Sequence, residues 1–269
     1  MDEEKLNMLT SLFKKSDRIL VAFSGGVDSS FLLYVLNKFT NSEVKGLTIK
    51  TPYIPQWEVD EASSFCKKHD IDHQIIELPF PESVINNPGD RCYRCKKILF
   101  SKISEYAQTE GFNIIADGSN ADDTGDYRPG MKALKELEIH SPLLELGIGK
   151  QEIRNKLKEF GLEVWNKPAY ACLLTRLQHD VKVENKALSI VEKAEVYIKE
   201  LGFPGTRVRL HGDLARLECP PTQITAICSA ETRKNISEYI KNLGVKYVTI
   251  DIDGYRTGSM NSEKSSDYE

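Results

Sequence analysis

The sequence predicts an α/β protein that has a parallel sheet and a second, smaller α+β domain. From Arg18 to about Leu146, short apolar runs alternate with stretches of helical periodicity, which is typical of a parallel sheet covered by helices on both faces. Around Gly147–Gln151 the pattern changes, and 269 residues are enough for two modest domains. We therefore expect an N-terminal domain over residues 1–147 and a C-terminal domain over residues 148–269.

The N-terminal pattern predicts four strands separated by helices. The strands are expected over residues 19–23, 44–49, 73–78 and 113–117, and the helices near residues 28–39, 57–69 and 95–109. Ligands of such sheets bind beyond the carboxyl ends of the strands. The loops that follow the strands, Asp117–Lys132 among them, should therefore assemble one site.

The C-terminal pattern predicts a mixed unit. An amphipathic helix over Gln151–Phe160 opens it, and a longer helix is expected over about Glu184–Leu201. Two short strands within Thr206–Cys219 flank a turn at 211–213, followed by a helix over 221–242 and a strand over Tyr247–Ile252. The polar tail, 261–269, is expected to be frayed.

Charge and hydropathy narrow the classes of partner. The net charge of -4 and the pI near 5.9 provide no broad cationic surface for a nucleic acid, so a small-molecule substrate is favoured. The sequence has no apolar segment approaching the ~20 residues of a membrane span, and its start lacks the apolar region of a signal peptide. We therefore expect a cytoplasmic enzyme without a membrane partner, and we expect it to form a homo-oligomer.

A loop rich in glycine and serine directly follows the apolar run Ile19–Phe23. Its glycines allow a tight turn, and its N–H groups and hydroxyls would face a ligand at the positive end of a helix, which suits a polyphosphate. The loop lacks the Gly-Lys-Ser/Thr ending of a Walker motif and resembles the SGGxDS loop of the ATP pyrophosphatases, which cleave ATP between its α and β phosphates. An ordinary serine-rich turn is the alternative. The residues expected to bind are Ser24, Gly25, Gly26, Ser29 and Ser30.

Asp28 lies inside this loop. A carboxylate beside phosphates is unfavourable unless a divalent cation lies between them, so we assign Asp28 to Mg²⁺. The alternative is a capping aspartate that contacts only backbone.

Three cysteines suggest a metal or redox centre. Cys92 and Cys95 form a C-x-x-C pair after a turn-rich loop, just before a helix expected over Lys96–Tyr106, and Cys172 lies in a later loop. The pair alone fits a disulfide, half of a zinc site or an iron–sulfur site, and a closed zinc site would need a ligand from elsewhere, such as His179 or Cys219. Three thiolates fit a 4Fe-4S cluster with one open iron that could deliver sulfide. The remaining cysteines, Cys66, Cys219 and Cys228, are expected to be packing residues.

Charged residues alternate along the first C-terminal strand. Arg207 and Arg209 should share one face, with Val208 and Leu210 toward the core. Two adjacent guanidinium groups repel unless an anion joins them, so a substrate phosphate or carboxylate is expected there. The alternative is a solvated face partnered by Asp213 or Glu218. Further carboxylates that could take part are Glu195, on the long helix, and Glu218.

Six segments spread along nearly the whole chain share the pattern of one family. They are AFSGGVDSS at 22–30, DRCYRCKK at 90–97, DGSNADDTGDYRPGMKA at 117–133, WNKPAYACLLTR at 165–176, GFPGTRVRLHGDLARLE at 202–218 and YVTIDIDGYRTGSMN at 247–261. In these segments the chain resembles the LarE sulfur-insertion enzymes. The resemblance implies a PP-loop (adenine nucleotide alpha hydrolase-like) domain, with ATP and Mg²⁺ as cofactors.

The activity implied by the resemblance is sulfur transfer to a small molecule. Such an enzyme adenylates the carboxylates of pyridinium-3,5-biscarboxylic acid mononucleotide and converts them to the thiocarboxylates of the nickel-pincer nucleotide. The resemblance also implies that Lys96 and Arg128 bind ATP and that Arg176, Arg207 and Arg209 bind the substrate. The catalytic set that it implies is Cys92, Cys95, Cys172, Glu195 and Glu218.

The LarE family contains two ways of supplying sulfur. In one, a single cysteine shortly before the arginine matched by Arg176 gives up its own sulfur; in the other, three cysteines hold a 4Fe-4S cluster. Cys172 lies one place from the sacrificial position, which Ala171 occupies, and the C-x-x-C pair is present. The cluster mechanism, with an external sulfide source, is therefore favoured.

Two other classes of enzyme remain as alternatives. One is an iron–sulfur tRNA thiolase of the same superfamily, against which the acidic pI and the lack of a zinc-ribbon cysteine array argue. The other is an ammonia-using synthetase in which Cys92 and Cys95 bind structural zinc or nothing. A salt-dependent shift of tRNA would favour the thiolase, and metal analysis after anaerobic purification would identify the synthetase.

Overall fold

The computed structural model describes residues 1–125, 129–168 and 170–256. The chain divides into two compact units. The first combines Met1–Val84 with Gly89–Tyr170, and the second combines the short segment Ile85–Pro88 with the chain from Ala171 onward. In the sequence, the short segment Ile85–Pro88 of the second unit therefore lies between the two segments of the first.

The first unit contains a four-stranded sheet in which every strand pair is parallel. Its order is β3-β2-β1-β4, with β1 central beside β2 and β4. This arrangement confirms the predicted parallel α/β fold. It also means that the loops after the four strands lie at the same edge of the sheet. The strands are β1 (Arg18–Ala22), β2 (Glu43–Lys50), β3 (Asp72–Glu77) and β4 (Ile114–Ala116).

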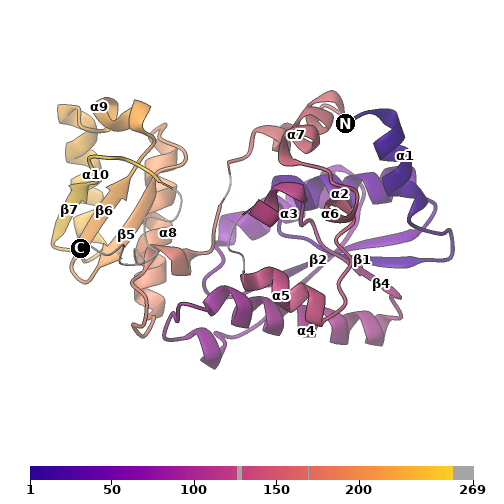
Figure 1. Ribbon diagram of the computed structural model, residues 1–269. Helices are drawn as coiled ribbons and strands as arrows, with labels where there is room; N and C mark the ends of the chain where they lie inside the picture. The colour runs from indigo at the N-terminus through magenta and orange to yellow at the C-terminus, as the bar shows by residue number, and fades with distance from the viewer. Residues whose placement is uncertain (126–128, 169, 257–269) are drawn as a thin grey trace, which may run out of the picture. The chain divides into compact units, whose positions relative to one another are not determined.

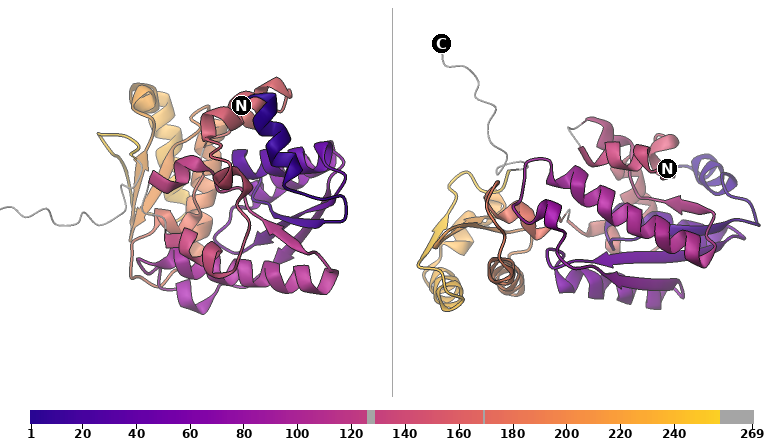
Figure 2. Two further views of the ribbon diagram at one scale, coloured as in Figure 1. Left: turned by 45° about the vertical axis from the view of Figure 1, so that its right-hand side comes forward. Right: turned by 90° about the horizontal axis from the view of Figure 1, so that it is seen from below.

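Helices cover both faces of this sheet (Figure 1), because successive apolar side chains of β1 point to opposite faces. Ile19 and Val21 pack with residues of α2, α3 and α7 on one face, whereas Leu20 packs with residues of α4 and α5 on the other. Figure 2 shows the long helix α4 running along the sheet. The helices are α1 (Glu3–Ser11), α2 (Val27–Phe39), α3 (Gln56–Lys68), α4 (Arg91–Glu110), α5 (Pro129–Glu136), α6 (Pro142–Glu145) and α7 (Lys150–Glu159).

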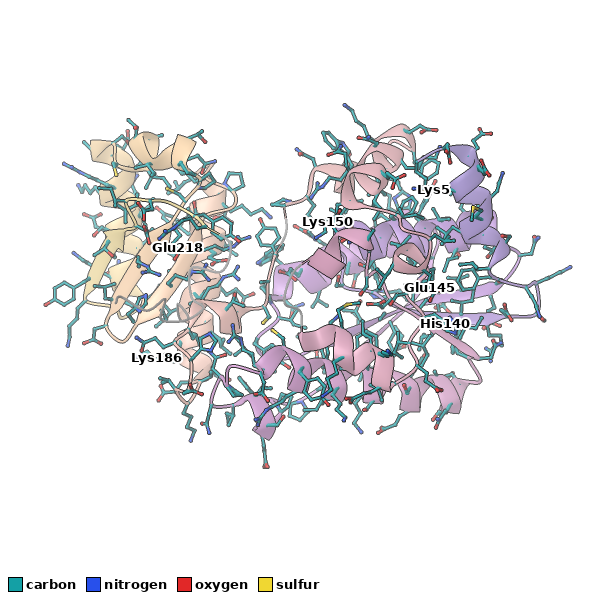
Figure 3. The ribbon with its side chains drawn as sticks, in the orientation of Figure 1. Lys5, His140, Glu145, Lys150, Lys186 and Glu218 are labelled. Carbon is teal, nitrogen blue, oxygen red and sulfur yellow. The ribbon has the colours of Figure 1, made fainter. Side chains whose placement is uncertain are left out.

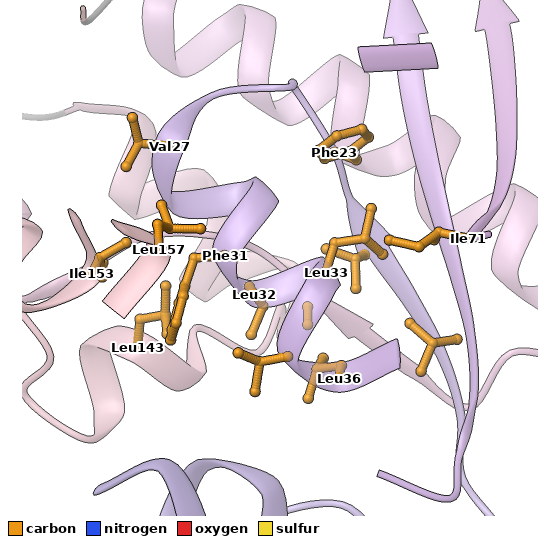
Figure 4. Packing of buried hydrophobic residues seen from close by; sticks show 14 of the residues in the cluster. Phe23, Val27, Phe31, Leu32, Leu33, Leu36, Ile71, Leu143, Ile153 and Leu157 are labelled. Carbon is orange, nitrogen blue, oxygen red and sulfur yellow. The ribbon is translucent and has the colours of Figure 1, made fainter. Parts of the chain in front are cut away.

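Helix α7 belongs to the first unit. Its Ile153 and Leu157 are fully buried, and they lie beside Phe31 of α2 in the same apolar cluster (Figure 4). The sequence placed the domain boundary after residue 147, where the pattern changes, whereas the units divide between Tyr170 and Ala171. The difference arises because the apolar face of α7 completes the core around α2.

The second unit contains a three-stranded sheet of order β5-β6-β7 with helices beside it. Strands β5 (Arg207–His211) and β6 (Leu214–Glu218) form the predicted antiparallel pair, and β7 (Tyr247–Ile250) joins β6 in parallel. The helices are α8 (Asn185–Glu200), α9 (Ile224–Ile227) and α10 (Ala230–Asn242).

The prediction of a single helix over 221–242 is wrong, because two separate helices, α9 and α10, occupy most of this range. A short 3-10 turn, Pro221–Gln223, precedes α9, and α10 starts only after Ser229. Ser229 has an extended backbone, with φ -56° and ψ 151°, so it interrupts the helical hydrogen bonds. Within the residues that the structure describes, every helix is too short or too polar to cross a membrane.

Candidate functional site

The phosphate loop connects β1 to α2 and depends on two glycines with no room for a side chain. Gly25 has φ +69°, and a Cβ atom there would lie 3.0 Å from Cβ of Ala62. Gly118, which follows β4, approaches the start of α2 so closely that its Cβ would lie 2.8 Å from the backbone nitrogen of Ser29. The loops after β1 and β4 therefore meet around the helix start.

Serine hydroxyls shape the inside of this loop. The Oγ atoms of Ser24 and Ser29 lie 3.1 Å apart, the Gly26 N–H donates to Ser24 Oγ at 3.3 Å, and the Ser29 hydroxyl donates to the Gly26 carbonyl. Helix α2 begins without a side-chain cap. Its first N–H groups and dipole are therefore oriented as in anion-binding helix starts.

Asp28 lies in the first turn of α2, beside Asn120 from the loop that follows β4. One carboxylate oxygen, Oδ2, accepts a hydrogen bond from Nδ2 of Asn120 at 3.0 Å. The other, Oδ1, is buried and has no hydrogen-bond partner among the described residues. Burial raises the pKa of Asp28 to about 6, with a further rise from Asp123, while Lys150 and Arg154 oppose it. An unpartnered oxygen on a destabilised carboxylate fits a divalent cation.

A second buried carboxylate stands beside Asp28 and was not predicted as a site residue. Asp123 is 7 % exposed, its Oδ2 accepts from the Asn120 N–H at 3.1 Å, and Oδ1 lies 3.4 Å from Nζ of Lys150. Lys150 lies at the start of α7 (Figure 3), where its own N–H donates to Asp122. The signal in the sequence was the polar run Asn120–Asp123 in the loop that follows β4.

Cys92 and Cys95 both lie within the first five residues of α4, which begins at Arg91. The prediction that the pair precedes the helix is therefore wrong, because the Asp90 carbonyl already accepts from the Tyr93 and Arg94 N–H groups. A spacing of three residues places both thiols on one side of the helix. Cys92 is exposed and Cys95 is half-buried.

The Cys95 thiol lies against the hydroxyl of Tyr53. Its Sγ lies 3.1 Å from the Tyr53 hydroxyl, and burial raises the pKa of this thiol while the Tyr53 hydrogen bond lowers it. Cys172 is half-buried at the start of the turn Leu173–Arg176 and belongs to the second unit. Within 1–125, 129–168 and 170–256, no three Cys, His, Asp or Glu side chains are gathered at metal-binding spacing. That the three thiols meet stays a prediction.

The other cysteines differ from one another. Cys66 and Cys219 are buried, at 1 % and 0 % exposure, as predicted for packing residues, and burial raises the pKa of Cys66 to about 12. The packing role predicted for Cys228 is wrong, since this side chain is exposed at the end of α9.

Lys96 and Arg128 are the two further residues expected at the ATP site. Lys96 follows the cysteine pair on α4, and its aliphatic stem lies so close to Gly130 that a Cβ there would be 2.6 Å from Lys96 Cδ. Arg128 lies outside the described residues. The Lys96 contact joins α4 to the start of α5, on the face of the sheet opposite α2.

Arg176 and Glu195 form a buried pair in the second unit. Nε and Nη2 of Arg176 lie 2.9 and 3.2 Å from the two carboxylate oxygens of Glu195, and Arg176 is 2 % exposed. Its Nη1 donates to the carbonyl of Ala171, next to Cys172. Glu195 also accepts the Val208 N–H at 3.0 Å. Arg176 thus ties the Cys172 loop to helix α8 and, through Glu195, to strand β5.

Arg207 and Arg209 are buried rather than solvated. Each is 4 % exposed; Arg209 donates twice to Glu218, and Arg207 lies 4.0 Å from Glu195. Glu218, labelled in Figure 3, is fully buried and also accepts from Arg216. The alternative of a solvated charged face was right that Glu218 is a partner of these arginines. It was wrong that the face is exposed to solvent, since both arginine side chains are buried. Carboxylates of the chain itself join these guanidinium groups.

Sequence reasoning also missed Asn87. This residue is fully buried with φ +50°, and its Nδ2 donates to the carbonyls of Leu174, Leu177 and Gln178 at 3.1, 3.1 and 2.8 Å. Together with Arg176, which binds the carbonyls of Ala171 and Cys172, it fixes the backbone of the loop that carries Cys172. The signal was the turn-forming pair 86–87, but nothing in the sequence shows which loop it contacts.

The all-parallel sheet with a Ser-Gly-Gly loop before α2 defines a PP-loop nucleotide-binding domain. The family model described as "Queuosine biosynthesis protein QueC" matches residues 18–88. An uncharacterized protein of Synechocystis sp. is 36% identical over 264 residues, which covers 97% of this chain and 98% of that protein. The pyridinium-3,5-bisthiocarboxylic acid mononucleotide synthase of Lactiplantibacillus plantarum is 33% identical over 256 residues, 94% of this chain and 92% of that protein.

A more distant relative is the tRNA-specific 2-thiouridylase MnmA of Rickettsia rickettsii, 28% identical over 201 residues, 60% of this chain and 54% of that protein. The long matches show the family. The chain belongs to the LarE family of the PP-loop ATP pyrophosphatase superfamily, and it is an ATP-dependent enzyme.

Proposed function

We propose that this enzyme is a sulfurtransferase that adenylates the carboxylates of pyridinium-3,5-biscarboxylic acid mononucleotide and converts them to thiocarboxylates. The observation that carries the proposal is the match to the Lactiplantibacillus synthase, which runs over 94% of the chain and through both units. ATP transfers AMP to a substrate carboxylate oxygen and releases pyrophosphate. Sulfide then replaces AMP, and AMP leaves with the oxygen.

In this proposal the first unit performs the ATP chemistry. The N–H groups at the start of α2 and the hydroxyls of Ser24 and Ser29 bind the departing pyrophosphate. Asp28 holds Mg²⁺ through its unpartnered Oδ1, and the neighbouring Asp123 adds negative charge at the same place. When bound there, Mg²⁺ would neutralise negative charge on the phosphates of ATP.

The face of β5 that carries Arg207 and Arg209 is proposed to bind the anionic groups of the substrate. Arg207 and Arg209 stand two residues apart on β5, so that both guanidinium groups lie on the same side of the sheet. Glu195 and Glu218 hold these groups and Arg176 in fixed geometry. A preorganised guanidinium loses little entropy when it binds a phosphate or carboxylate, which supports this role.

Cys92, Cys95 and Cys172 are proposed to hold a 4Fe-4S cluster. The donor set supports it: two thiols lie three residues apart on one helix, one of them exposed, and a third begins the turn Leu173–Arg176. When bound, a cluster with three thiolate ligands leaves one iron that can accept sulfide. Arg176 and Asn87 fix the backbone beside Cys172. We also propose a cytoplasmic homo-oligomer supplied by a separate sulfide source.

The test is product analysis with the anaerobically purified protein, ATP, Mg²⁺, sulfide and the pyridinium dicarboxylate mononucleotide. We expect AMP and pyrophosphate, together with a substrate in which one or two oxygens are replaced by sulfur, detected by mass spectrometry. Formation of ADP and phosphate would contradict the ATP chemistry. Thiolated tRNA, or an amide formed with ammonia, in place of the thiocarboxylate would support the other two classes of enzyme.

A further inference from the structure

The phosphate loop has no Walker lysine, yet a lysine contacts its backbone. Nζ of Lys167 donates to the Gly25 carbonyl at 2.9 Å and lies 2.8 Å from Oε2 of Glu61 on α3. The side chain is 14 % exposed, and its ammonium lies 5.7 Å from the centre of the Trp57 ring. Lys167 follows the short turn Glu163–Asn166, far from the loop in sequence.

The contacted carbonyl belongs to the peptide group that carries the Gly26 N–H. A cation at the oxygen of a peptide polarises the whole group, so its N–H becomes a stronger donor. Gly26 is the N-cap of α2, where an anion would bind, and within the described part of the chain its N–H donates a long hydrogen bond, 3.3 Å, to Ser24 Oγ. The positive charge of Lys167 would therefore reach a phosphate bound at this helix start through the Gly25–Gly26 peptide.

The same contact holds the backbone of the loop in place. Gly25 has φ +69° and packs against Ala62 of α3, and Glu61, the preceding residue, positions the ammonium of Lys167. The loop is therefore fixed by packing through Ala62 and by a charged hydrogen bond through Lys167. A loop held in this way loses little entropy when it binds a phosphate.

We propose that Lys167 is a positioning residue of the phosphate loop, which strengthens and orients the backbone donors that bind pyrophosphate and the phosphates of ATP. The inference rests on the proposed function only in that the loop binds a polyphosphate. It requires neither the pyridinium substrate nor a cluster.

The test is calorimetric titration of the full chain with magnesium pyrophosphate. Lys167→Met should weaken binding about tenfold or more, because a charged hydrogen bond behind the loop is lost. Lys167→Arg should retain much of the affinity, and Lys167→Gln, which keeps a donor without the charge, should resemble Lys167→Met. The matched control is Lys68→Met, since Lys68 lines the same cavity with a side chain 62 % exposed, and its affinity should stay unchanged.

Chemical rescue separates this role from a structural one. Lys167, Glu61, Trp57 and Gly25 line a cavity of about 670 Å³, so a small alkylammonium can enter where the lysine side chain is removed. Ethylammonium should restore pyrophosphate affinity to Lys167→Ala but not alter the wild type. Affinities of Lys167→Met and Lys167→Gln equal to wild type, or a lower melting temperature without weaker binding, would overturn the inference. A wild type that does not bind magnesium pyrophosphate would instead contradict the proposed ATP chemistry.

Discussion

Arg209 and Glu218 form a buried ion pair between the two strands of the β5–β6 hairpin. Nε and Nη2 of Arg209 lie 3.0 and 2.8 Å from Oε2 of Glu218, whose side chain is completely inaccessible to solvent. Glu218 Oε1 accepts a further hydrogen bond from Arg216 at 2.9 Å. One carboxylate therefore contacts two guanidinium groups, and its loss would remove a negative charge that the buried Arg209 and its neighbour Arg216 share.

The first prediction is that Glu218→Gln destabilises the protein by about 3 to 5 kcal/mol, the usual range when one member of a buried pair is removed. Denaturant unfolding followed by circular dichroism measures this change. The matched control is Asp213→Asn, which breaks the exposed pair with Lys246 and should leave the unfolding midpoint unchanged. Equal effects of the two changes would show that the Glu218 pair is not structurally important.

The residues of β5 could be placed from the sequence only in part. Alternation along β5 correctly predicted that Val208 and Leu210 are buried, since side chains alternate between the faces of a strand. It did not predict that Arg207 and Arg209 are buried as well. Their burial depends on Glu195 from α8 and on Glu218 from β6, and such tertiary pairing leaves no periodic signal in the sequence.

A second prediction concerns Asp28 and the ATP reaction. Asp28→Ala should abolish the formation of AMP and pyrophosphate, because the proposed Mg²⁺ ligand is lost while the fold is retained. The reaction is followed by separating the nucleotide products, and circular dichroism checks the fold. Asp122→Ala is the control. Among the described residues the Asp122 carboxylate accepts a hydrogen bond from the Lys150 N–H, while the Asp122 N–H that donates to Asn120 is kept in the variant, so the variant should retain most of the activity. Pyrophosphate formation by Asp28→Ala at the wild-type rate would contradict the assignment.

The raised pKa of Asp28 gives a third prediction. Its pKa is 3.8 in a solvated chain and about 6 in the folded protein, so between these values the folded state binds more protons than the unfolded state. Ionisation of Asp28 therefore lowers the free energy of unfolding as pH rises from about 4 to about 6, by up to about 3 kcal/mol without Mg²⁺. Asp28→Asn removes this ionisation.

Denaturant titrations of wild type and Asp28→Asn at several pH values test this predicted fall in the free energy of unfolding. A chelator is present to remove Mg²⁺. The variant should gain stability relative to wild type as pH rises and keep the gain above about pH 6. Added Mg²⁺ should reduce the difference, because the ionised carboxylate of the wild type binds the cation. A stability difference that does not change with pH would show that Asp28 has an ordinary pKa.

The fourth prediction is that Asn87 fixes the loop that carries Cys172. Asn87→Ala should destabilise the protein by about 2 to 4 kcal/mol, since three carbonyls lose their donor. Asn87→Gly permits φ +50° without supplying the donors, so it separates the side chain from the backbone. Both variants should also show faster alkylation of Cys172 by iodoacetamide, measured by peptide mass spectrometry. Stability of Asn87→Gly equal to wild type would show that the three hydrogen bonds contribute little.

The four strands of the first unit and its helices α2, α3, α4 and α7 could be predicted, because each has its own hydrophobic period, whereas α1, α5 and α6 were not predicted. The bounds that failed depend on local hydrogen bonds: Asp90 starts α4 before the cysteine pair, and Ser229 separates α9 from α10. The phosphate loop was predictable from its residues alone. Asp123, Lys167 and Asn87 were not, since each acts on a segment distant in sequence.

The final prediction concerns the three cysteines. Cys92→Ala, Cys95→Ala and Cys172→Ala should each lose iron and sulfur-transfer activity together after anaerobic reconstitution, measured by iron and sulfide analysis and by the absorption spectrum. Cys228→Ala is the matched control, since Cys228 is exposed like Cys92 and should keep both. Cys66→Ala and Cys219→Ala should keep iron as well, although removal of a buried side chain lowers their stability.

The sacrificial mechanism predicts a different result for the same protein. Cys172 would lose its sulfur in one turnover and become dehydroalanine, a loss of about 34 Da as H₂S that peptide mass spectrometry detects. In the cluster mechanism Cys172 keeps its mass, and repeated turnover requires only added sulfide. Dehydroalanine at Cys172 in a protein without iron would therefore overturn the cluster proposal, whereas an intact Cys172 after several turnovers per chain would exclude the loss of its own sulfur.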